Sequence, residues 1–223
     1  MKRIVKGLEP ERLRRWKEEN AAVPQNLNYG NMPTTEVKSQ MMVEQGYLCA
    51  YTMKRIQTLG DCHIEHVTPR NQPGQPLHSD IDYNNLLACF PGNKPPLKWN
   101  SQYPYGAQRK SGTHVDQNNF VSPLQEDVER RFNYAPDGSV EPVAADAAAR
   151  NSISVLGLDH EQLVELRKAA IEERVLDAEL SADDAATLAV EILTVNSDGR
   201  YPEFCIAISQ VAGWYAGRIR DRK

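Results

Sequence analysis

The segment of residues 47–112 limits the possible folds more than any other part of the chain, because it cannot form one long helix. It carries seven of the chain's 14 prolines, together with several glycines and asparagines. Proline inside a helix removes a backbone hydrogen bond and clashes with the preceding turn, so the segment favours short strands joined by loops. Four of the five histidines lie in it or just after it. Since binding and catalytic side chains gather on loops held by a scaffold, we expect the chemistry of the protein here.

Helical patterns return on both sides of this segment. Helices are predicted over residues 9–20, 36–45, 123–132, 144–154, 159–180 and 202–218, with another beginning near Ser181 and a turn at residues 136–139. The expected organisation is an N-terminal helical segment that binds a partner (1–45), a central core (46–119) and a C-terminal helical region (120–223). The predicted fold class is therefore α+β, with short strands and loops set in a mainly helical frame.

The composition is that of a globular protein, with 40% hydrophobic and 25% charged residues. We expect a cytoplasmic location and no membrane association, because the first residues lack the apolar core of a signal peptide and no stretch could cross a bilayer. The four cysteines form no CxxC pair, which favours free thiols in a reducing compartment. The net charge of −4 does not exclude a nucleic-acid ligand, because the distribution of charge sets the local field.

Three motifs in the central segment carry chemically suggestive residues. They are CAYT at residues 49–52, HIEHVTP at residues 63–69 and DYNNLLAC at residues 82–89. Together they resemble the HNH endonucleases, and most of all the HNH subunit of Septu-type anti-phage systems, including the retron-linked versions. Downstream matches at residues 120–123, 132–134, 137–138 and 156–158 extend the resemblance over roughly residues 46–174.

The resemblance implies a ββα-metal (HNH) core that hydrolyses phosphodiester bonds with a divalent metal, Mg²⁺ or Mn²⁺. In it, His66 would be the general base, Glu65 a metal ligand, and Asn85 a catalytic-site residue that orients the loop and the base. An imidazole with a pKa near 6.5 can accept a proton at physiological pH. Adjacent side chains on a strand point to opposite faces, so we expect the chain to bend near Pro69 to bring Glu65 and His66 to one site.

The sequence departs from the family pattern at the structural zinc site. Relatives with this site use two CxxC pairs, which hold zinc through four sulfur atoms. Here Thr52 replaces one cysteine, and the partner of Cys89 falls on Gly92 or, with a longer loop, near Gly106. We therefore predict no structural zinc. Cys62 and His63 are the alternative ligands that would restore it.

The last ligand of the catalytic metal has three candidates. A short loop after Cys89 offers Asn93, which we favour slightly, and a longer loop offers Gln108; either amide oxygen suits a hard cation. The two prolines at residues 95–96 oppose a helix that begins directly after Asn93, which favours the longer loop. His114 is a better ligand chemically, but it lies further along the chain.

Basic residues flank the predicted site and would bind nucleic acid: Arg70, Lys94, Arg109 and Lys110. The acidic excess is concentrated elsewhere, with nine Asp or Glu against three Lys or Arg over residues 159–184. This distribution gives phosphates a basic face to approach.

The resemblance further implies DNA as the substrate, with RNA left open. It also implies an ATPase partner of the ABC or SMC class, and a retron reverse transcriptase with its RNA and DNA as a further partner. Two other interpretations remain. The first is a degenerate HNH protein that binds nucleic acid or acts as a scaffold without cutting. The second is a hydrolase of another phosphoester.

Overall fold

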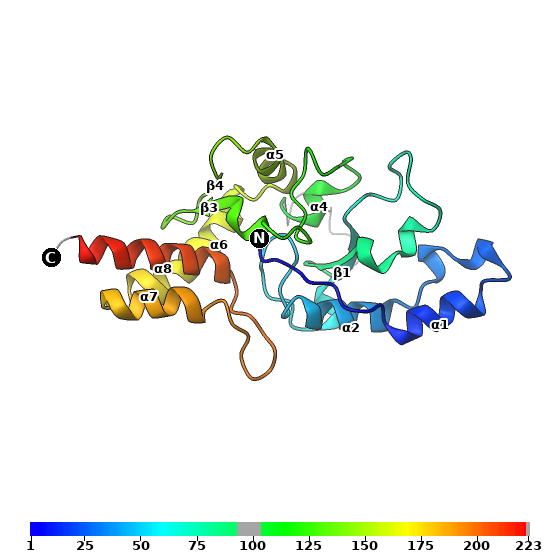
Figure 1. Ribbon diagram of the computed structural model, residues 1–223, viewed down its shortest axis with the longest axis horizontal. Coiled ribbons are helices and arrows are strands. Elements are labelled where there is room, and N and C mark those ends of the chain that lie inside the picture. Colours follow the sequence, from blue (N-terminus) through cyan, green and yellow to red (C-terminus); the bar gives the residue numbers. More distant parts are fainter. Residues whose placement is uncertain (93–103, 222–223) are drawn as a thin grey trace.

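The computed structural model describes residues 1–92 and 104–221, and their fold is mixed α+β. The described part is elongated (Figure 1), with α1 towards one end, α7 and α8 at the other, and α2, β1 and α4 between them. One continuous hydrophobic core extends from Met1 to Ala212, so the three predicted segments share it. None of the described helices has the length and apolarity that a bilayer crossing requires.

The N-terminal helices α1 (Glu11–Glu19) and α2 (Thr34–Glu44) lie close to their predicted positions. They bury one face each: α1 buries Leu13 and Trp16, and α2 buries Val37, Met41 and Met42. The residues before α1 are hydrogen-bonded to residues of the C-terminal region of the chain. The Ile4 amide donates to the Pro123 carbonyl at 2.8 Å, and the amino terminus donates to the Tyr134 hydroxyl at 2.8 Å.

The central segment forms an antiparallel pair of strands, β1 (His63–His66) and β2 (Leu86–Cys89), as its composition predicted. All four residues of β2 are buried, whereas in β1 only Ile64 and His66 are. The Gln45 side chain, at the end of α2, bonds both the amide and the carbonyl of Ala88 and thereby fixes β2 against α2. The short helix α4 (Ala107–Lys110) follows at Gly106, whose φ of +70° suits glycine.

The C-terminal region begins with a second hairpin, β3 (Phe132–Tyr134) and β4 (Val140–Pro142), joined at the predicted turn. Helices α5 (Ala147–Leu156), α6 (Glu161–Ile171), α7 (Ala182–Glu191) and α8 (Cys205–Arg220) follow, with a π-helical turn (Glu172–Leu176) directly after α6. The Arg167 side chain is 2% exposed and donates to the Gly138 carbonyl at 2.7 Å and the Leu158 carbonyl at 2.7 Å. This buried cation ties the hairpin turn to α6.

The helix predicted over residues 123–132 is wrong. The structure has a single 3-10 turn (Val128–Arg130) there, and Phe132 already belongs to β3. Tertiary bonds account for the difference: the Pro123 carbonyl binds the N-terminal segment, and β3 pairs with β4. Neither partner is visible in the local periodicity.

Candidate functional site

A pocket of about 530 Å³ lies between β1, the loop that follows it, and α4. Its lining includes every residue of β1, together with Tyr29, Pro69, Arg70, Asn71, Ala107, Gln108, Ser111 and Gly112. Because β1 pairs only with β2 in the described residues, its other edge is free of strand pairing. The pocket follows this edge, and so side chains from both faces of β1 reach it.

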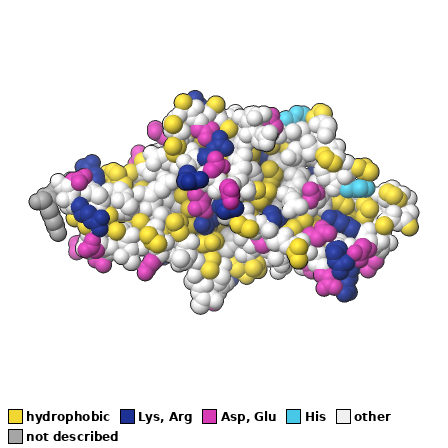
Figure 2. All heavy atoms as spheres, viewed as in Figure 1, with side chains coloured by type: hydrophobic (Ala, Val, Ile, Leu, Met, Phe, Trp, Pro, Cys, Tyr) yellow, Lys and Arg dark blue, Asp and Glu magenta, His cyan; other side chains and the backbone are white. Residues whose placement is uncertain are grey.

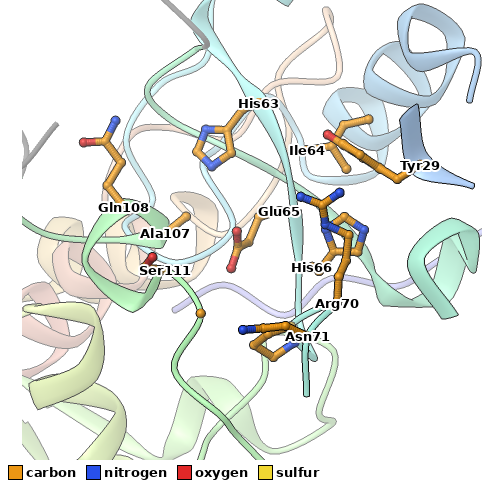
Figure 3. A pocket seen from close by; sticks show the side chains of 12 residues that line it. Tyr29, His63, Ile64, Glu65, His66, Arg70, Asn71, Ala107, Gln108 and Ser111 are labelled. Carbon is orange, nitrogen blue, oxygen red and sulfur yellow. The ribbon is translucent and has the colours of Figure 1, made fainter. Parts of the chain in front are cut away.

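Figure 3 shows the two faces of β1, with His63 and Glu65 on the side of α4, and Ile64 and His66 on the side of Tyr29 and Arg70. The chain bends at residues 67–68, close to Pro69 as expected, but β1 pairs regularly with β2 as far as His66 opposite Leu86, so this bend does not bring Glu65 and His66 to one face. The two residues therefore reach the pocket from opposite faces. A ligand can meet both only by lying across the strand edge.

The His66 ring is held in one orientation. It is 8% exposed, its edge meets the Tyr29 ring at a centroid distance of 4.9 Å, and Nε2 lies 2.9 Å from the Asp80 carbonyl oxygen. Because a carbonyl can only accept, Nε2 must carry the proton, which leaves the Nδ1 lone pair as the basic site. Burial lowers the pKa of His66 below its ordinary value, against the opposing effect of the Asp80 carbonyl. The imidazole is therefore neutral and able to accept a proton at physiological pH.

Asn85 fixes the long loop between the two strands. Its Oδ1 accepts from the Thr68 amide at 2.8 Å, and its Nδ2 donates to the carbonyls of Thr68 at 3.0 Å and Ser79 at 3.2 Å. Ser79 precedes Asp80, whose carbonyl orients His66. Asn85 is thus hydrogen-bonded to the loop that carries the Asp80 carbonyl.

Glu65 is paired with a buried cation. The Lys110 ammonium lies 2.7 Å from Glu65 Oε1 and 2.9 Å from the His66 carbonyl, and Lys110 is 0% exposed. Lys110 was predicted to bind nucleic acid, but the structure buries it beneath the pocket. Burial raises the pKa of Glu65, and the Lys110 ammonium opposes this rise. No local pattern revealed the pair, because its two members lie 45 residues apart.

The other predicted basic residues differ in their surroundings. Arg70 is exposed at the pocket, with its guanidinium 4.6 Å from the Tyr29 ring centroid. Arg109 is exposed too, but its Nε donates to the Ser154 carbonyl at 2.9 Å. Lys94 and the predicted metal ligand Asn93 lie outside the described residues. On the face in Figure 2, acidic and basic side chains are mixed along the molecule.

A hydrogen bond at Nδ1 fixes the His63 ring and leaves Nε2 as the basic nitrogen. Its Nδ1 lies 2.5 Å from the Pro91 carbonyl, so Nδ1 carries the proton and Nε2 keeps a lone pair. Burial lowers the pKa of His63, against the effect of the Pro91 carbonyl. The sequence analysis considered His63 only as a substitute zinc ligand. The alternation along β1, which puts residues 63 and 65 on one face, was the signal that could have identified it.

Gln108 and His114, the alternative metal ligands, have different positions. Gln108 lines the pocket, and its Oε1 is buried without a hydrogen-bond partner in the described part of the chain. His114 is exposed and does not line the pocket. No group of three His, Cys, Asp or Glu side chains suited to a metal ion occurs among the described residues. His63 and Glu65 lie on one face of β1, whereas the Gln108 amide points away from both in Figure 3.

The positions that hold zinc in the resembling family come together in space. Cys49 is hydrogen-bonded to Cys89 and to Thr52, and a Cβ at Gly106 would lie 3.0 Å from Thr52 Cγ2. The longer-loop alignment therefore puts Gly106 beside Thr52. Burial opposes ionisation of Cys49, but hydrogen bonds from Cys89, Thr52 and the Phe90 backbone outweigh it and lower the pKa of Cys49 to about 6.

Comparison with known proteins adds nothing to this geometry. No protein-family model matches the chain, and no curated protein sequence matches it either. The functional interpretation depends on the sequence motifs and on the arrangement of the side chains.

Proposed function

We propose that the chain is a metal-dependent endonuclease of the HNH type, which hydrolyses phosphodiester bonds at the pocket beside β1. The observation that carries the proposal is the oriented, neutral His66 on the same strand as Glu65, at the edge of a hairpin that a short helix follows. A strand pair and a helix that meet around a base and a carboxylate are the parts that the ββα-metal core requires.

In this mechanism, His66 acts as the general base. The Asp80 carbonyl keeps the proton on Nε2, so Nδ1 accepts the proton of the attacking water. The Arg70 guanidinium, exposed beside His66, attracts the phosphate and positions it across the strand edge. Glu65 and His63 would hold the divalent cation, which when bound neutralises the charge that develops on the phosphate.

The resemblance described above supplies the biological setting of the proposal. We propose DNA as the substrate, an ABC- or SMC-like ATPase as the partner, and anti-phage defence in the cytoplasm as the role, with a retron reverse transcriptase in some systems. The exposed Arg70 at the pocket suits a polyanionic ligand. The basic residues of α1 contribute little net charge, since Arg14 pairs with Glu18 at 2.6 Å and Arg15 pairs with Glu11 at 2.5 Å.

A second candidate is a non-catalytic nucleic-acid-binding or scaffolding subunit. The observation that favours it is the Lys110–Glu65 pair, because an ammonium already occupies one oxygen of the only carboxylate that lines the described pocket. A pocket without a metal would still present Arg70 to a phosphate. The two candidates differ in whether His66 is needed for cutting.

The test uses the full chain, alone and with its ATPase partner, incubated with DNA and with RNA in Mg²⁺ or Mn²⁺. We expect His66→Ala to lower the cleavage rate by about 10²–10⁴-fold, as loss of a general base does. The matched control is His160→Asn, at a partly exposed helix N-cap that lies outside the pocket and whose replacement keeps the capping function. Equal cleavage by wild type and His66→Ala would refute the assignment of the base. Nucleic-acid binding without cleavage under all conditions would favour the second candidate.

A further inference from the structure

We propose that a second pocket, beside the loop that joins α7 to α8 (residues 192–204), binds a nucleotide through its phosphate monoester. The pocket has a volume of about 630 Å³, within the range typical of small-molecule sites. The loop projects from the elongated body in Figure 1. The second pocket shares no lining residue with the pocket beside β1, so the inference does not depend on the proposed function.

Three arginines from separate parts of the chain line the second pocket. Arg55 lies between α2 and β1, Arg174 lies in the π-helical turn after α6, and Arg200 lies in the loop before α8. The only acidic residue of the described lining is Glu191. In the described part of the chain, the Arg55 and Arg200 side chains form no ion pair with a carboxylate. Arg174 lies 3.7 Å from its exposed neighbour Glu173, a pair of little strength in water. The pocket therefore offers three guanidinium groups to an anion.

Backbone carbonyls hold the Arg55 guanidinium in the pocket wall. It donates to the carbonyls of Gly46 and Tyr47, each at 3.3 Å, and to the carbonyl of Tyr201. A guanidinium has five N–H donors, so these three bonds leave two for a ligand. A fixed fork of donors suits an oxyanion, because little side-chain entropy is lost when the ligand binds.

Arg200 is positioned near Arg55 by its own loop. The Asn196 side-chain oxygen accepts from the Arg200 amide at 2.9 Å, and the Asn196 amide donates to the Arg200 carbonyl at 3.0 Å. The Arg200 guanidinium lies 4.5 Å from the Tyr47 ring centroid. Burial lowers the pKa of Arg55, Glu203 opposes this effect, and Arg200 adds to it. The two guanidinium groups therefore repel each other, and an anion bound between them would offset that repulsion.

The chemistry of the lining favours a phosphate monoester over a carboxylate. Guanidinium groups match phosphate oxygens with paired, charge-assisted hydrogen bonds. A phosphate monoester carries a charge of about −1.5 to −2 at pH 7, so it can engage more than one arginine. The same lining also contains apolar side chains that suit a sugar and a base: Leu188, Ile192, Val195 and Pro202. A nucleoside monophosphate presents both parts.

The experiment titrates deoxyadenosine monophosphate into the full chain by calorimetry, without metal and in a phosphate-free buffer. We expect one binding site per chain, and at least tenfold weaker binding of deoxyadenosine, which lacks the phosphate. Arg200→Met should weaken binding of the monophosphate at least tenfold, and the more exposed Arg174→Met about threefold. Two variants outside the second pocket should bind as wild type does: the exposed Arg150→Met on α5, and Arg70→Met at the pocket beside β1.

Three results would overturn the proposal: no binding by wild type, equal binding of the nucleoside, or wild-type affinity in both Arg200→Met and Arg174→Met. Loss of binding in Arg70→Met alone would overturn it too, because it would assign the ligand to the pocket beside β1. Thermal unfolding without ligand shows whether Arg200→Met is folded, and Arg174→Met tests the site if it is not.

A competition experiment identifies the source of the phosphate. A 5′-phosphorylated dinucleotide that competes as well as the monophosphate assigns the ligand to a strand end. One that competes at least tenfold more weakly assigns it to a free nucleotide. Either result, if it depends on Arg200, supports the phosphate site.

Discussion

The two hairpins of this protein are built alike but differ in what surrounds them. Each is a pair of short antiparallel strands, and each is contacted by a buried cation from a later helix. At β3–β4, Arg167 donates to two backbone carbonyls and lies 5.5 Å from the Tyr134 ring centroid, and a tight turn joins the strands. At β1–β2, Lys110 binds a carboxylate, and the connection is the long loop of residues 67–85 that carries Arg70 and Asp80. Arg167 therefore supplies hydrogen bonds to backbone carbonyls. Lys110 bonds Oε1 of Glu65 and leaves the other carboxylate oxygen for the pocket.

Among the variants that test this comparison, Lys110→Met is expected to lower the unfolding free energy most. It leaves the buried Glu65 carboxylate without its cation, and removing one member of a buried pair costs about 3–5 kcal/mol of unfolding free energy. The pKa of Glu65, already raised by burial, should rise further. The cost should therefore shrink as the pH falls and the carboxyl is protonated. Urea unfolding at pH 7 and pH 5 measures both effects.

A double variant provides the control for Lys110→Met. Adding Glu65→Gln removes the charge that Lys110 neutralised, so the double variant should be more stable than Lys110→Met alone. A pH-independent cost, or no recovery in the double variant, would mean that Lys110 acts through packing alone.

A somewhat smaller effect, about 2–3 kcal/mol, is expected for Arg167→Met. It leaves the carbonyls of Gly138 and Leu158 without their donor, and an unsatisfied buried group costs about 1–3 kcal/mol. Because no carboxylate is bonded to Arg167, this loss should be the same at pH 5 and pH 7. The exposed Arg150→Met on α5 is the matched control, expected to unfold as wild type does. A strong pH dependence would remove the distinction between the two cations.

Asn85→Ala should cost about 1–2 kcal/mol, because it removes three hydrogen bonds from a partly exposed loop. The effect should be local to the loop and to His66. Nitrogen NMR of the imidazole should show the Nε2-protonated tautomer in wild type and a mixture of tautomers in Asn85→Ala. An unchanged tautomer would show that Asp80 holds His66 without help from Asn85.

A modest pH effect is expected from the two histidines of β1. Burial lowers the pKa of both His63 and His66 below 6.5, so the unfolded chain binds protons that the folded chain does not. Their contribution to stability is complete above pH 6.5 and is lost as the pH falls through the folded pKa values. The Tm between pH 7.5 and pH 5 should fall less steeply in His66→Asn than in wild type. An equal slope in the variant would argue against a buried neutral His66.

Removing metal is expected to have no effect on stability through the four positions that match the family's zinc ligands. Two thiols, a hydroxyl and a glycine make a poor tetrahedral site, so a chelator should leave the Tm of Glu65→Ala unchanged. Elemental analysis of that variant should find no stoichiometric zinc. About one zinc per chain would contradict the prediction and assign a structural role to Cys49 and Cys89.

Local patterns predicted much of the fold. Helical periodicity predicted α1, α2 and the C-terminal helices, and the proline-rich centre predicted short strands. The Pro-Asp-Gly pattern predicted the turn between β3 and β4, but not the two strands. These succeeded because each depends on backbone preferences within a few residues. The helix expected at residues 123–132 failed because its backbone bonds to distant segments instead. The roles of Glu65, His66 and Asn85 stay predictions until the variants are measured.

The sequence by itself indicated short strands in the segment that contains residues 63–66, and the alternation along a strand sends Glu65 and His66 to opposite faces. Only the tertiary structure decided what meets them there: Lys110 beneath Glu65, the Asp80 carbonyl at His66, and the Pro91 carbonyl at His63. Those partners lie 45, 14 and 28 residues away in the chain. Spacing along the chain fixes the face on which a side chain lies, but the packing of loops and helices around the hairpin selects the atoms that reach it.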